Sequence, residues 1–71
     1  MASIARSRFA AHVRRLRKAA RWSQEELGEH AGIHRTYIGA MERGEANVTL
    51  DHVQKIADAL QVDVSELLGA V

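Results

Sequence analysis

Four histidines and nine acidic residues are the side chains of this 71-residue chain that could hold a metal ion or move a proton. His30 and His34 are four positions apart, but Gly32 breaks the helix between them. His12 and His52 have no close ligand partner in the sequence, and the chain has no cysteine. No nucleophile motif or phosphate-binding glycine loop accompanies the acids. We therefore expect no metal site, no cofactor, no small-molecule ligand and no enzymatic activity.

The basic residues are distributed unevenly along the chain. The formal net charge is only +1, yet residues 1–24 carry seven arginines and lysines and no acid. The remaining residues carry three basic and nine acidic groups, which gives a net charge of −6. The basic block is either a solvated helix face or a side that faces phosphates. The second interpretation requires a DNA-binding element next to it.

The stretch from Gln24 to Gly44 has the spacing of two short helices joined by a tight turn. Ser23 and Glu26 form a capping box for the first helix, and Gly44 is a good C-terminal cap for the second. The apolar positions recur at helical intervals and are Leu27, Ala31, Ile33, Ile38 and Met41. Such helices cross steeply and present the second one outward, which on a small basic scaffold is suited to the major groove of DNA.

Helical periodicity accounts for most of the chain. We expect helices at about 7–20, 23–31 and 34–43, a fourth from Thr49 to near Leu60, and a short last helix opened by a capping box at Asp63 and Glu66. Residues 1–71 are thus predicted to form one all-α domain of five helices. No signal peptide or membrane-spanning run is present, so we expect a cytoplasmic protein without a membrane partner.

These features resemble the Cro/phage-repressor type of helix-turn-helix, the XRE family, from about Leu16 to Leu68. The strings LRKAARWSQEELGEHAGIHRTYIGAMERG and NVTLDHVQKIADALQVDVSELL carry the resemblance. The short length and the pattern RTYI, ER and N-aliphatic-T further resemble the controller proteins of restriction–modification systems. The resemblance implies a five-helix Cro/repressor-like fold. It also implies a homodimeric, sequence-specific transcriptional regulator that binds a palindromic or near-palindromic site in double-stranded DNA.

The resemblance places base-reading side chains in the first turn of the third helix. Arg35 could donate two parallel hydrogen bonds to guanine O6 and N7, and Thr36 could contact a base edge or a thymine methyl group. The alternative for both is a solvated helix face. Tyr37 could reach DNA or pack on the second helix. The further base-reading candidates are His34, which stands where a capping Ser or Asp is common, Gly39 and Ala40.

Phosphate contacts are expected at the two ends of the helix pair. Gln24 opens the second helix, where free N–H groups and the helix dipole favour an anion. Arg43 and Asn47 flank the loop after the reading helix, although Arg43 could serve only the dipole of its own helix. Basic residues of the first helix could add long-range attraction, and these are Arg14, Arg15 and Lys18.

Four positions bear on the fold rather than on DNA. In the family, an arginine at the place of Arg17 pairs with the glutamate that here is Glu42, and the pair joins the first and third helices. Arg21 stands where relatives usually have glycine, so a left-handed backbone there would cost roughly 1 kcal/mol. Gly28 replaces the usual alanine and is expected to loosen the second helix slightly.

The last helix and the acidic second helix are the candidate protein contacts. Val64, Leu67, Leu68 and Val71 supply more apolar surface than one neighbouring helix needs, so we expect a homodimer interface there, with ordinary core packing as the alternative. Exposed Glu25 and Glu29 could touch RNA polymerase or form a solvated face. The rival function is a protein-interaction module, such as an antitoxin that no longer reads DNA.

Overall fold

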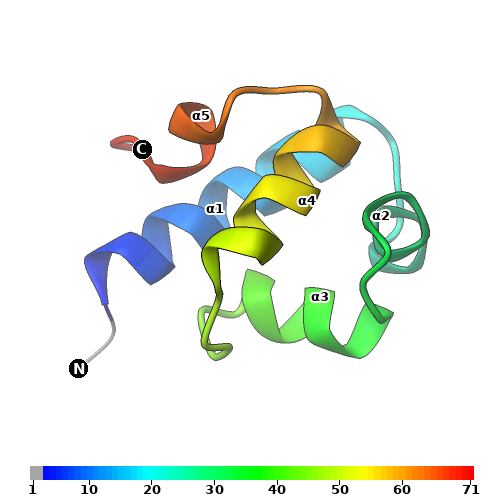
Figure 1. The fold of residues 1–71 in the computed structure, drawn as a ribbon, viewed down its shortest axis with the longest axis horizontal. Helices are drawn as coiled ribbons and strands as arrows, with labels where there is room; N and C mark the ends of the chain where they lie inside the picture. Colours follow the sequence, from blue (N-terminus) through cyan, green and yellow to red (C-terminus); the bar gives the residue numbers. More distant parts are fainter. Residues whose placement is uncertain (1–2) are drawn as a thin grey trace.

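The computed structural model describes residues 3–71, and these form five helices and no strand. The helices are α1 (Ile4–Ala19), α2 (Gln24–Ala31), α3 (Arg35–Glu42), α4 (Leu50–Leu60) and α5 (Val64–Leu68). Figure 1 shows α3 along the lower edge, α2 at the side, and α4 crossing in front of the long α1. The short α5 packs against α1 and α4. The predicted all-α class is confirmed.

The helix starts are set by side chains that accept backbone N–H groups. The predicted capping box of Ser23 and Glu26 is present at α2. α1 begins at Ile4, three residues earlier than predicted, because the Ser3 hydroxyl accepts the N–H of Arg6. Helical periodicity alone therefore placed the start of α1 too late in the sequence.

The caps of α4 and α5 differ from expectation in their chemistry. Thr49 caps α4 as predicted, and its own N–H donates to Nδ1 of His52, an imidazole in the place of the usual glutamate. At α5, Oδ1 of Asp63 accepts the N–H of Ser65 at 2.8 Å, and the structure shows no reciprocal bond from Glu66. That backbone hydrogen bond lowers the pKa of Asp63 from its ordinary value of 3.8.

The core is filled by large apolar side chains from all five helices. Those with no more than 2% of their surface exposed are Phe9, Val13, Leu27, Ile38, Met41, Ile56 and Leu67. The complete burial of Leu67 corrects one prediction, because a side chain inside the single chain cannot form a dimer interface. α5 uses Leu67 to pack on α1 and α4, whereas Val71 is 84% exposed.

A buried histidine joins α1 to the C-terminal end of the chain. Nε2 of His12 lies 3.0 Å from the carbonyl oxygen of Gly69, and its Nδ1 lies 3.1 Å from an Nη atom of Arg15. A tautomer with its hydrogen on Nε2 satisfies both contacts, since Nε2 then donates to the carbonyl and Nδ1 accepts from the guanidinium. This arrangement also turns Arg15 toward α5.

The structure also shows the surroundings of His30 and of the unusual Arg21. His30, in the last turn of α2, stacks on Trp22, which precedes that helix, with ring centroids 4.1 Å apart. Arg21 has a φ of 62°, the left-handed conformation expected for this position, and its N–H donates to the carbonyl of Lys18.

Within residues 3–71, no group of three or more His, Cys, Asp or Glu residues could hold a metal ion. No helix in the same range has the length and apolar character needed to cross a membrane.

Gly28 lies where α2 approaches the chain that leads into α3. A Cβ atom at this position would overlap the carbonyl oxygen of Ile33 and would lie 3.4 Å from the backbone nitrogen of Arg35. A backbone atom in a tight turn cannot move away as a side chain can. With the turn placed as it is here, glycine avoids this overlap, so it does more than loosen the helix.

Gly28→Ala is accordingly expected to destabilise the fold. Overpacking costs about 1–3 kcal/mol, which exceeds the roughly 1 kcal/mol that alanine adds through helix propensity. Thermal unfolding followed by circular dichroism measures the difference. Gly39→Ala is the matched control, because its Cβ would meet only the flexible ends of Arg43 and Gln24 at 3.2 and 3.3 Å. Equal melting temperatures for Gly28→Ala and the wild type would contradict this account.

Candidate nucleic-acid interface

The turn between α2 and α3 fixes how far α3 projects. Gly32 ends α2 with φ 70° and ψ 35°, a left-handed conformation that glycine adopts without a steric cost. The N–H of Ile33 then donates to the carbonyl of Gly28 at 2.9 Å. α3 buries Ile38 on its inner face. Its outer first turn therefore points to solvent.

An open groove runs between the N-terminus of α2 and the outer face of α3. The residues that line it are Arg17, Ser23, Gln24, Glu25, Arg35, Thr36, Gly39 and Arg43. The groove brings the two main base-reading candidates, Arg35 and Thr36, next to the phosphate candidates Gln24 and Arg43. Both base-reading candidates are exposed. The geometry thus presents donors of the type that bind base edges and phosphates.

Beneath the groove lies the predicted Arg17–Glu42 ion pair. Nε of Arg17 donates to Oε2 of Glu42 at 2.6 Å, and Nη2 donates to Oε1 at 2.9 Å. The side chains are only 11% and 3% exposed, and Nη1 donates to the carbonyl of Trp22 at 2.8 Å. The hydrogen bond to Glu42 is the main cause that raises the pKa of Arg17. The pair joins α1 to α3 and supports the floor of the groove.

Gln24 is part of the same network. Its Nε2 donates to Oε1 of Glu42 at 3.3 Å, so one amide hydrogen is directed into the protein rather than toward a ligand. The second amide hydrogen remains for a phosphate. A substitution at Gln24 would consequently affect both the ion-pair network and any contact with DNA.

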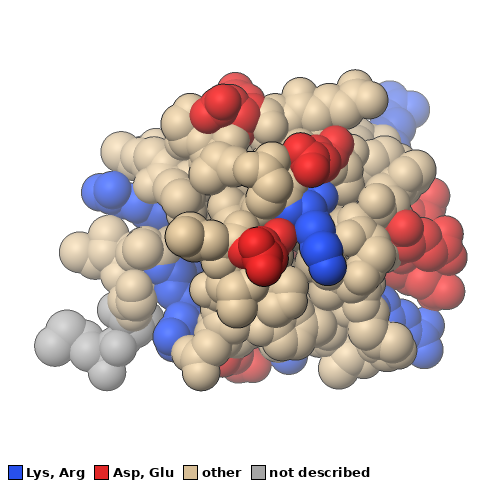
Figure 2. Space-filling view, viewed as in Figure 1, with Lys and Arg blue, Asp and Glu red and all other residues tan. Residues whose placement is uncertain are grey.

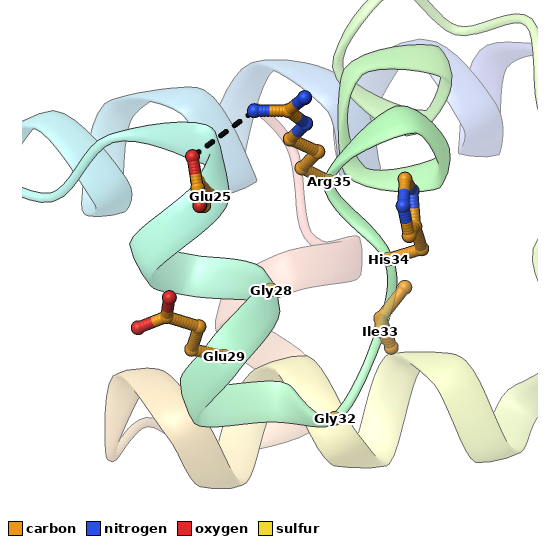
Figure 3. A pocket seen from close by; sticks show the side chains of 7 residues that line it. All are labelled: Glu25, Gly28, Glu29, Gly32, Ile33, His34 and Arg35. Atoms are coloured by element: carbon orange, nitrogen blue, oxygen red, sulfur yellow. Dashed lines mark hydrogen bonds and ion pairs between the residues drawn. The ribbon is translucent and has the colours of Figure 1, made fainter.

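Each arginine at the groove is paired with a nearby carboxylate. Nη1 of Arg35 donates to Glu25 across the helix pair at 3.1 Å (Figure 3), and Nε of Arg43 donates to Glu45 at 2.9 Å. All four side chains are about 60% exposed, so each pair contributes only about 0.2–1 kcal/mol. Separating Arg35 or Arg43 from its carboxylate therefore costs at most about 1 kcal/mol.

The loop after α3 is held by two hydrogen bonds to Asn47. Oη of Tyr37 donates to the Asn47 carbonyl at 2.6 Å, and Nη2 of Arg6 donates to Oδ1 of Asn47 at 2.8 Å. The Tyr37 ring also lies against His52, with centroids 4.9 Å apart. Tyr37 therefore contacts the loop and α4, and its hydroxyl helps to hold the backbone of Asn47. Arg6 was missed by sequence analysis because 41 residues separate it from Asn47.

Four further candidates are revised by their surroundings. Gly39 is buried beneath Gln24 and Arg43, so it allows those side chains to cover α3 rather than reading a base. Ala40 is half-buried against the core. Nδ1 of His34 accepts the Thr36 N–H at 3.1 Å and caps α3, the role that Ser or Asp usually has. The fourth candidate is Arg15, whose guanidinium bonds to His12.

The basic residues of α1 do not all face the same way. Arg15 bonds to His12 beside the end of α5. Residues two positions apart on a helix point in directions about 200° apart. Arg15 therefore points away from Arg17 and the groove. Arg15 is therefore removed from the phosphate candidates. Arg14 and Lys18 are exposed and remain candidates. Figure 2 shows a group of acidic side chains on the α2 side and several basic ones on the side where α1 begins, while both signs lie next to each other in the middle of this face.

A helix-turn-helix family model matches residues 13–67, which include α2, the turn and α3. The chain belongs to the XRE-type helix-turn-helix family. This helix-turn-helix protein is a DNA-binding transcriptional regulator and not an enzyme. The groove between α2 and α3 is thus the part of the molecule in which its contacts to DNA are to be sought.

Two curated relatives and one solved structure show which XRE-type regulators are similar. The control protein C.SmaI of Serratia marcescens is 49% identical over 60 residues, which cover 84% of this chain and 71% of the relative. The control protein C.BamHI of Bacillus amyloliquefaciens is 44% identical over 61 residues, which cover 84% and 75%. The crystal structure of the restriction-modification controller protein C.AhdI from Aeromonas hydrophila superposes with a TM-score of 0.84 at 40% identity, covering 87% and 94%.

Proposed function

We propose that this regulator is a homodimeric controller of a restriction–modification operon that recognises a palindromic or near-palindromic site in double-stranded DNA. The observation that carries the proposal is the exposed first turn of α3, which places Arg35 and Thr36 beside Gln24 and Arg43 in one groove. The controller role is supported by relatives that carry that name and match most of the chain.

In this proposal, different residues contact the bases and the phosphates. Arg35 donates to guanine O6 and N7, and Thr36 contacts the neighbouring base. Gln24, Arg43 and Asn47 bind phosphates and fix the orientation of α3. Arg14 and Lys18 add attraction without fixed contacts, since both are exposed on α1.

A salt titration of binding tests the proposal. Fluorescence anisotropy with a labelled duplex should show affinity that falls with salt at a log–log slope of roughly −0.9 per phosphate, or about −4.5 to −7 for five to eight phosphates. Absence of binding to any duplex at low salt would contradict the proposal. That outcome would favour the protein-interaction module, including an antitoxin that no longer reads DNA.

The dimer surface that we propose lies next to α5 and extends to the first turns of α1 and α4. Among residues 3–71 the exposed large apolar side chains are Ile4, Leu50 and Val71, at 71%, 80% and 84% exposure. Leu50 and Leu68 line a largely apolar groove of about 350 Å³ together with Ala5, Phe9, Val48 and Val53, and the polar residues Ser3, Arg6 and Asn47 complete its lining. In Figure 1 the start of α1 and the C-terminus lie on the same side of the molecule, away from α2. Pairing through this surface would leave α3 of both protomers free for one face of DNA, about 34 Å apart.

Leu50→Glu is expected to dissociate the dimer without unfolding the chain. Leu50 is 80% exposed and lies at the first position of α4, where a carboxylate is favourable. Loss of an apolar interface anchor should raise the dimer dissociation constant at least about 30-fold, measured by sedimentation equilibrium. Gln54→Glu adds the same charge to α4 outside the groove and should leave the dimer intact. Equal dissociation of both variants would contradict this placement.

A further inference from the structure

We propose that Glu25 is a specificity-determining residue, because its carboxylate withholds Arg35 from phosphates and leaves that guanidinium for a base with two acceptors. The inference rests on the proposed binding of DNA through α3. The inference gives a role to Glu25, an acidic side chain in the surface that is proposed to approach DNA.

The geometry of the pair is the first argument. Glu25 comes from the first turn of α2 and Arg35 from the first turn of α3, and Figure 3 shows the two side chains pointing toward each other. Oε2 of Glu25 accepts from Nη1 of Arg35 at 3.1 Å. The N-terminal dipole of α2 stabilises a carboxylate at this position. Glu25 therefore places a carboxylate beside Arg35 in the lining of the groove.

The donors that remain on Arg35 are the second argument. A guanidinium has five N–H donors, and the bond to Glu25 uses Nη1 only. The edge formed by Nε and Nη2 still presents two parallel donors, which match O6 and N7 of guanine. The carboxylate thus leaves the base-reading edge of Arg35 available.

Charge is the third argument. An unpaired arginine on this surface would bind any phosphate, which adds affinity for every sequence and no discrimination. The Glu25 carboxylate offsets part of the charge of Arg35 and repels a phosphate that approaches the pair. The pair should therefore weaken non-specific binding more than specific binding.

The Arg43–Glu45 pair provides a control within the same surface. Its distance of 2.9 Å and its exposure of 59% and 63% resemble those of the Arg35–Glu25 pair, at 3.1 Å, 64% and 60%. Arg43, however, follows α3 at its C-terminal end and is proposed to bind a phosphate. Removing the carboxylate beside a phosphate contact should strengthen binding to all sequences alike.

The test compares Glu25→Gln with Glu45→Gln. Anisotropy titrations use a duplex selected by the wild type from a random pool and a scrambled duplex of equal length. Glu25→Gln should raise affinity for the scrambled duplex about three- to fivefold, with little change for the selected one, so the specificity ratio falls by the same factor. Its salt slope on the scrambled duplex should steepen by up to about 0.9. Glu45→Gln should raise both affinities and leave the ratio unchanged.

The possible outcomes separate this inference from the function on which it rests. A wild type that does not distinguish the two duplexes refutes the proposed function itself. If the wild type does distinguish them, equal specificity ratios for Glu25→Gln and Glu45→Gln overturn the inference. Glu25→Gln is also made in an Arg35→Ala background, where it should change both affinities alike. A ratio that still falls in that background would mean that Glu25 acts without Arg35, which also overturns the inference. Thermal melts confirm that every variant is folded.

Discussion

Replacing Arg17 by alanine is expected to lower the free energy of unfolding by about 3–5 kcal/mol, because the substitution leaves a buried carboxylate without its charge partner. Glu42 is 3% exposed on its side chain and accepts two hydrogen bonds from Arg17. In a domain of this size 1 kcal/mol corresponds to roughly 4–8 °C. The melting temperature measured by circular dichroism should therefore fall by at least about 12 °C.

A double substitution separates the effect of the two charges on stability from the effect of side-chain packing. Arg17→Met combined with Glu42→Leu removes both charges and should recover most of the lost stability, since paired buried charges are often replaceable by apolar side chains. Loss of DNA binding by Arg17→Ala would then report unfolding rather than a lost contact. A free energy of unfolding for Arg17→Ala within 1 kcal/mol of the wild type would show that the pair does not hold α1 to α3.

Arg35→Ala is expected to reduce affinity for the selected site about 10- to 100-fold, which corresponds to the 1–3 kcal/mol of a bidentate contact with guanine. Affinity for scrambled DNA should change much less, because Glu25 already offsets the charge of Arg35. The measurement is the ratio of the two dissociation constants at one salt concentration.

Arg43→Ala is the matched control for this prediction. It removes the same functional group from the other exposed pair of the groove, and it should weaken binding to both duplexes by a similar factor. Gln24 is less suitable, because its amide also bonds to Glu42 inside the fold. If Arg35→Ala and Arg43→Ala altered the specificity ratio equally, the proposed division between base reading and phosphate binding would be wrong.

The fold could be predicted from the sequence where the cause is local. Ser23, Thr49 and Asp63 cap helices by bonding to backbone groups two or three residues away, so the printed sequence contains both partners. Gly32 and Gly44 have positive φ at the turns where glycine indicates a helix end. The Arg17–Glu42 pair lies 25 residues apart and was predicted only through the family resemblance.

The details of the site could not be predicted, because they depend on how two helices cross. Gly39 and Ala40 were expected among the base-reading positions, yet Gln24 of α2 and Arg43 cover the first, and the second is half-buried against the core. The same crossing brings Glu25 to Arg35, and the fold of the loop brings Arg6 to Asn47. Spacing along the chain gives the face of a helix but not the neighbour that covers it.

Selection of bound duplexes from a random DNA pool by the wild-type protein tests the central claim most directly. If α3 of each protomer enters the major groove with Arg35 on a guanine, the recovered sequences should contain an inverted repeat. Its half-sites should be centred about 10 base pairs apart, each with a guanine at the equivalent position. A pool that shows no enrichment, or a recovered site without that symmetric guanine, would contradict the claim.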